Sequence, residues 1–148
     1  MEGHLKTNQQ NMKLIITENK LFNSIYNYID KTFNSSKMDW VYGMDEDEDG
    51  YPDVDRENEN FLMFFEGDYQ GNYDTDYVFH YFDVDYYSTE PSHKPFRDKA
   101  PILEVIGKHA EHLDDMFEGH WEEPMKKWFE DNFNLPVKSV STYYDYEN

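Results

Sequence analysis

Hydrophobic positions recur with two different spacings along this chain. Between residues 21 and 33 apolar side chains return every three or four positions, which predicts an amphipathic helix that ends near Asn34. Residues 61–65 form an unbroken apolar run, and residues 77–87 alternate between apolar and polar side chains, which predicts two strands. Gly67 and Gly71 lie between these strands, so we expect an antiparallel hairpin with the first helix packed on one face.

The remaining pattern completes an α+β fold. We expect a short strand at 13–17 that leads into the first helix, with Thr17 as the N-cap of that helix. A second strand is expected to begin at 40–42, and a last strand to lie at 137–144. Two further helices are predicted, one over 102–116 and one that starts near Pro124. Residues 45–59 are predicted to be an acidic loop, and 88–100 a connector. The prediction is a single compact domain over residues 12–148, with an antiparallel aromatic-rich sheet and about three helices, after a flexible segment at 1–11.

Aromatic residues supply much of the material for a core. Only 38% of the 148 residues are hydrophobic, but the chain has 13 Tyr, 11 Phe and 3 Trp. Each large ring buries about 150–250 Å², so a modest number of rings can stabilise a domain of this length. We therefore expect the chain to fold despite its high charge.

Negative charge is concentrated in the middle of the chain. The net charge is −19, and residues 39–90 hold 17 acidic residues against one base, Arg56. Such a field repels nucleic acid and anionic membranes and attracts basic protein surfaces or divalent cations. The chain has no cysteine, and its early apolar run, Leu14 to Ile16, is too short for the core of a signal peptide. We therefore expect a cytoplasmic protein that binds neither nucleic acid nor membranes directly.

One segment has the spacing of a calcium-binding loop. Asp45, Asp47, Asp49 and Asp53, with the Tyr51 carbonyl and a Gly at the bend, match the first half of an EF-hand loop. The second half does not match, because Arg56 stands where the bidentate Glu belongs. Two interpretations stay open: weak Ca²⁺ binding, or a solvated acidic loop.

Acidic residues also occur at alternate positions. Side chains at i and i+2 of an extended strand lie about 6.6–6.8 Å apart on one side, which is on the order of the phosphate spacing of a nucleic-acid strand. We therefore consider Asp74, Asp76, Asp83 and Asp85 as a candidate partner-binding set that mimics nucleic-acid charge. The alternative is a solvated strand face.

Met12 to Glu18 and Trp128 to Lys138 resemble segments of small uncharacterised proteins of tailed bacteriophages, over about 18 of the 148 residues. The resemblance implies the cytoplasm of a host bacterium and no particular chemistry. The sequence shows no phosphate-binding loop, nucleophile elbow or cysteine nucleophile, so we predict no enzyme activity. The leading hypothesis is an accessory protein that occupies a basic surface of a host protein, such as a nucleic-acid-binding protein. The alternatives are a calcium-loop domain and a virion or structural protein.

Overall fold

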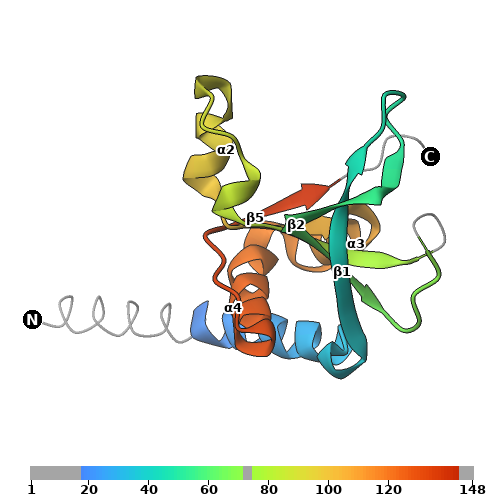
Figure 1. Ribbon diagram of the computed structural model, residues 1–148. Coiled ribbons are helices and arrows are strands. Elements are labelled where there is room, and N and C mark those ends of the chain that lie inside the picture. The colour runs from blue at the N-terminus through green and yellow to red at the C-terminus, as the bar shows by residue number, and fades with distance from the viewer. Residues whose placement is uncertain (1–17, 72–74, 144–148) are drawn as a thin grey trace, which may run out of the picture.

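The computed structural model describes residues 18–71 and 75–143. Its centre is a five-stranded sheet with the strand order β1-β2-β3-β4-β5 (Figure 1). Neighbouring strands are antiparallel except for β4 and β5, which are parallel. The α+β prediction is therefore confirmed, with a sheet that is mostly rather than purely antiparallel. The strands are β1 (Met38–Glu46), β2 (Pro52–Glu66), β3 (Tyr77–Phe82), β4 (Ile102–Ile106) and β5 (Ser139–Tyr143).

Three helices cover one face of the sheet. They are the helix at residues 18–32, α3 (Gly107–Phe117) and α4 (Glu122–Phe133), which is joined to α3 by the 3₁₀ turn η4 (Glu118–Trp121). Ile25, Ile29 and Phe33 recur every four residues and are buried against the sheet, as the spacing predicts. The short 3₁₀ turn η1 (Ser35–Lys37) then leads into β1. The expected strand at 13–17, its Thr17 cap and residue 144 lie outside the described residues.

Helix α4 holds the centre of this core. Trp128 and Phe129 are fully buried, and the Trp128 indole N–H donates to the Asp30 carboxylate at 3.0 Å, which ties α4 to the helix at 18–32. Pro124 occupies the first turn, where its missing N–H costs nothing. The helix ends at Asn134, which adopts the left-handed conformation with φ 55°. Both features agree with the predicted helix.

The predicted helix at 102–116 is wrong in its first third. Residues 102–106 form β4, and α3 begins only at Gly107. Ile102, Leu103 and Val105 satisfy a helical spacing, but two of them are β-branched, and this strand buries side chains on both of its faces. A short apolar run does not distinguish a buried strand from a helix, and the pairing with β3 and β5 decides it.

The strand predicted at 77–87 is also too long. β3 ends at Phe82, and Val84–Tyr86 form the 3₁₀ turn η2. Asp83 and Asp85 therefore do not lie on a strand. The predicted connector at 88–100 folds as a second 3₁₀ turn, η3 (Pro91–His93), and a short helix, α2 (Lys94–Lys99). We call residues 84–100 the α2 arm.

The acidic segment at 45–59 is not a loop. β1 continues to Glu46 and β2 begins at Pro52, so most of the segment is a β-hairpin. Backbone pairing needs no particular side chain, and exposed acids can project from it into water. β2 has 15 residues where β1 has 9, and register shifts at Tyr42/Gly43 and Met44/Asp45 place the extra residues in two bulges. We call residues 43–60, beyond the first shift, the acidic arm.

The two arms rise from the same side of the sheet. In Figure 1 the acidic arm and the α2 arm both project away from α4 and the helix at 18–32. The sheet face between them carries a second, smaller hydrophobic cluster built around Phe61, Met63, Phe82, Ala100 and Ile102. The three helices pack on the opposite face and leave this face uncovered.

Candidate functional site

A continuous series of aromatic contacts connects the two arms. The Phe61 ring, at the base of the acidic arm, stacks on Phe82 with ring centroids 4.3 Å apart. Phe82 contacts Tyr86 at 4.8 Å, and Tyr86 contacts Tyr87 at 5.0 Å. Tyr87 stacks on Phe96 of α2 at 5.7 Å. These rings hold the α2 arm in a defined position relative to the sheet.

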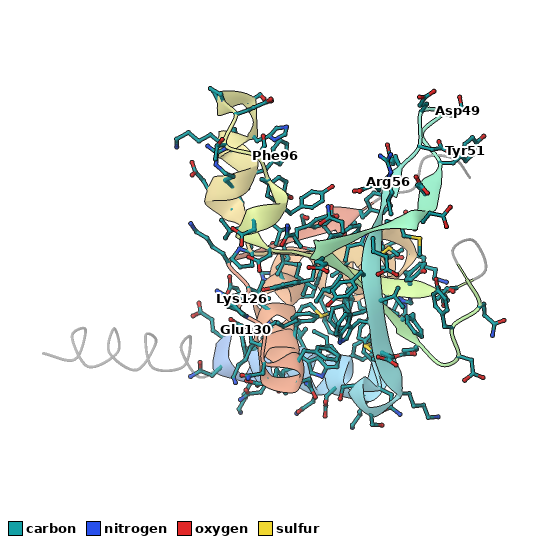
Figure 2. The ribbon with its side chains drawn as sticks, in the orientation of Figure 1. Asp49, Tyr51, Arg56, Phe96, Lys126 and Glu130 are labelled. Carbon is teal, nitrogen blue, oxygen red and sulfur yellow. The ribbon has the colours of Figure 1, made fainter. Side chains whose placement is uncertain are left out.

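A cleft of about 540 Å³ opens beside this aromatic series. Its walls come from the acidic arm and from the α2 arm, and its floor comes from the sheet. Figure 2 shows Phe96 on the α2 arm, while Asp49 and Tyr51 mark the tip of the acidic arm. The lining residues are Asp45, Asn58, Phe82, Tyr86, Tyr87, His93, Phe96 and Glu104.

Glu104 is the acidic group of the cleft that lies deepest in the sheet. It stands on β4 opposite His80 of β3, and its side chain is 21% exposed. Burial raises the pKa of Glu104 to about 7. Among the described residues no lysine or arginine forms an ion pair with its carboxylate. Within this part of the chain the cleft therefore contains a carboxyl group without a lysine or arginine partner.

His80 does not supply a positive charge to Glu104 either. Its Nδ1 lies 3.9 Å from the Glu104 carboxylate, but burial lowers the pKa of His80 to about 4. At neutral pH the imidazole is uncharged, so the proximity is not an ion pair. His80 instead packs among aromatic rings, with the centroids of Phe61 and Tyr143 at 5.1 and 5.2 Å.

The electrostatic field in the cleft is negative. Burial raises the pKa of Tyr86, and the carboxylates of Asp45, Glu104 and Glu46 raise it further. Burial likewise raises the pKa of Tyr87 to about 12, with a further contribution from Glu104. Tyr86 and Tyr87, which are neighbours in the aromatic series, thus both sense the Glu104 carboxylate. A positively charged group entering the cleft would be attracted to it.

The acidic arm extends this field into solvent. Residues 43–60 contain nine acidic side chains and one base, Arg56, which contacts Asp53 at 3.7 Å. Glu48, Asp49, Asp55, Glu57 and Glu59 are exposed, and none of them has a salt bridge within the described part of the chain. Most of the negative charge of the acidic arm is therefore exposed to solvent.

Two of the five groups of the predicted calcium loop form hydrogen bonds within the hairpin. The Asp47 carboxylate accepts the N–H groups of Asp49 and Tyr51, both at 2.9 Å, and the Tyr51 carbonyl accepts the N–H of Asp47 at 2.7 Å. Asp45 and Asp53 face each other across the strand pair. No group of three or more His, Cys, Asp or Glu side chains is arranged to hold a metal in residues 18–71 and 75–143. The hairpin thus uses two of the five groups to close its own turn.

The structure does not bring the predicted partner-binding aspartates together. Asp74 lies outside the described residues. Asp76 precedes β3 and pairs with Lys108 at 2.6 Å, whereas Asp83 and Asp85 follow the other end of the strand. The six residues of β3 separate Asp76 from Asp83 and Asp85 by roughly 20 Å.

Sequence reasoning missed the cleft. Glu104 interrupts the apolar run Ile102 to Ile106, and a lone acid in such a run is the signal that could have identified it. The contributions of Tyr86, His93 and Phe96 had no comparable signal, because they depend on how the α2 arm folds back.

Comparisons with protein-family models, with curated proteins and with solved structures found no match to this chain. Within the described ranges, the helices are too short or too polar to cross a membrane.

Proposed function

We propose that this protein is an acidic binding module that occupies a basic surface of another protein, with the acidic arm and the adjoining cleft as its binding face. One observation carries the proposal: a β-hairpin with nine acidic side chains stands beside an aromatic cleft whose carboxyl groups have no lysine or arginine partner among the described residues. Solvated acids that serve solubility alone have no need of a shaped cleft beside them. The proposal assigns no catalytic activity.

Charge arrangement supports a protein partner rather than nucleic acid. A net charge of −19 repels phosphate backbones and accelerates encounter with basic surfaces. The helix-covered face of the sheet buries its apolar side chains within the domain, whereas the opposite face keeps exposed rings such as Tyr86 and Phe96. Aromatic side chains in a polar surround are typical of protein-binding surfaces. The resemblance to phage proteins favours a basic protein of the host cytoplasm as the target.

Capture from bacterial lysate by the immobilised full chain tests this proposal. At about 0.15 M salt we expect basic proteins to bind and to elute when the ionic strength reaches about 1 M, because surface charges are then screened beyond roughly 3 Å. Neutralising four exposed residues of the acidic arm (Glu48→Gln, Asp55→Asn, Glu57→Gln and Glu59→Gln) should abolish most of the capture. None of these side chains takes part in a salt bridge in the described part of the chain.

A matched control removes the same charge elsewhere. Glu111, Asp115, Glu118 and Glu123 are exposed on the helical side of the molecule, and neutralising them changes the net charge by the same amount. We expect this control to retain capture. Equal loss in both variants would show that total charge, not the acidic arm, attracts the partner, and identical capture at low and high salt would refute the proposal.

A further inference from the structure

We propose that the cleft between the two arms receives an arginine side chain of the partner, with the guanidinium held between the Glu104 carboxylate and the exposed ring of Tyr86. This inference rests on the proposed function and identifies the group that the binding face recognises. The cleft offers the two features that a guanidinium requires, a flat aromatic surface and a carboxylate, side by side.

The aromatic surface is exposed and rigid. Tyr86 is 38% exposed and Phe96 is 51% exposed, although each is fixed on its other side by a ring contact with Tyr87. A cation over such a ring gains electrostatic attraction to its negative face, and a planar guanidinium can also stack on it. Because the rings are already positioned by their neighbours, little conformational entropy is lost when a ligand binds.

The carboxylates supply the charge. Glu104 opens into the cleft without a lysine or arginine partner among the described residues, and Asp45 lines the same space from the acidic arm. No lysine or arginine lines the cleft. Of the three lysine and arginine side chains of the adjoining α2 arm, Lys94 pairs with Asp98 at 2.6 Å and Arg97 donates to the carbonyl oxygen of Glu90 at 2.9 Å. A positive group must therefore come from outside the cleft.

Arginine fits this geometry better than lysine. A guanidinium presents a planar fork of N–H donors that can bind a carboxylate in two places and still stack on a ring, whereas an ammonium is a compact, strongly hydrated point charge. Burial of Glu104 favours the more weakly hydrated cation, because that cation loses less solvation when it enters the cleft. The acidic arm attracts either cation, so selection between them falls to the cleft.

Titration of the full chain with octa-arginine and with octalysine tests this inference. At equal ionic strength we expect octa-arginine to bind about tenfold more tightly, which corresponds to one good cation–π and carboxylate contact. Glu104→Gln and Tyr86→Leu should each reduce the affinity for octa-arginine towards that for octalysine, and should change the octalysine affinity no more than the loss of one exposed acid does. Phe96→Leu, at a more exposed position, serves as a second aromatic variant if Tyr86→Leu impairs folding.

Two controls separate the cleft from the general charge. Glu111→Gln removes one exposed acid from α3, and Tyr69→Leu removes a tyrosine that is 46% exposed on another part of the surface. Both should leave the arginine preference intact. Equal affinity for the two peptides, or loss in Glu104→Gln no larger than in Glu111→Gln, would overturn the arginine cleft while the acidic arm still binds. If neither peptide binds, the proposed function itself fails.

Discussion

The ring of Phe61 lies directly on the backbone of Gly43. A Cβ atom placed on Gly43 would come within 1.8 Å of the Phe61 Cδ1 atom and 2.3 Å of its Cγ atom. The contact follows from the first register shift, which places Phe61 in the bulge of β2 opposite Gly43 of β1. Because Phe82 stacks on Phe61 at 4.3 Å, the ring has no room to move away. Gly43 therefore sets where the acidic arm leaves the sheet.

Gly43→Ala should destabilise the protein. The new methyl group must displace a buried ring, and overpacking of this kind costs typically about 1–3 kcal/mol in the free energy of unfolding. Denaturant unfolding of the two proteins measures the loss. Gly119→Ala is the matched control, because no atom lies within 4 Å of the added Cβ there and it should change stability little.

A double mutant distinguishes a local clash from a general effect at Gly43. Phe61→Ala removes the ring, so Gly43→Ala should cost much less in that background than in the natural protein. Equal costs in the two backgrounds would show that Phe61 is not the reason for glycine at this position.

Glu104→Gln should stabilise the protein at alkaline pH. The pKa of Glu104 is raised from 4.5 to about 7 in the folded state, so the folded protein retains a proton that the unfolded chain has released. The free energy of unfolding therefore falls as pH rises from 4.5 through 7, by at most about 3 kcal/mol at 1.36 kcal/mol per pKa unit. The variant lacks this loss. We expect it to be more stable than the natural protein at pH about 8 and similar below pH about 4.

Thermal unfolding across this pH range checks the Glu104 prediction. Glu111→Gln removes the same charge from an exposed position and corrects for the reduction in overall repulsion. If the difference between Glu104→Gln and the natural protein is the same at both ends of the range, the pKa of Glu104 is not raised by its burial.

Asp47 should act as a turn-closing residue without calcium. Asp47→Ala removes the acceptor for two N–H groups and should destabilise the hairpin by about 1 kcal/mol, while Asp47→Asn keeps an acceptor oxygen and should cost less. We expect Ca²⁺ on the order of 1 mM to leave the melting temperature unchanged. A calcium-dependent rise that disappears in Asp47→Asn, together with terbium emission sensitised by Tyr51, would support the calcium interpretation instead.

Local patterns in the sequence identified several elements correctly. The spacing of Ile25 and Ile29 predicts the first helix, Pro124 marks the start of α4, and residues 61–65 predict the C-terminal part of β2. The antiparallel pairing of β2 with β3 is also confirmed, including the contact of both strands with the first helix through the main core. In each case the apolar period or a backbone constraint acts within the segment itself.

The errors have a common physical cause. Ile102 to Ile106 fits a helix by spacing, yet hydrogen bonds to β3 on one side and β5 on the other make it a strand. The acidic composition of residues 45–59 predicts a loop, yet pairing of the backbone between β1 and β2 makes a hairpin. Pairing partners far apart in the chain cannot be read from local composition.

The sequence alone determined the acidic character of this protein, its aromatic core material and its α+β class, because charge, ring content and hydrophobic period belong to the residues themselves. Only the tertiary structure decided where these properties meet. Glu104 of β4, Tyr86 after β3 and Phe96 of α2 form one cleft because the α2 arm folds back over the open sheet face. Burial there changes the pKa of Glu104, and burial is a property of the assembled fold rather than of a residue type.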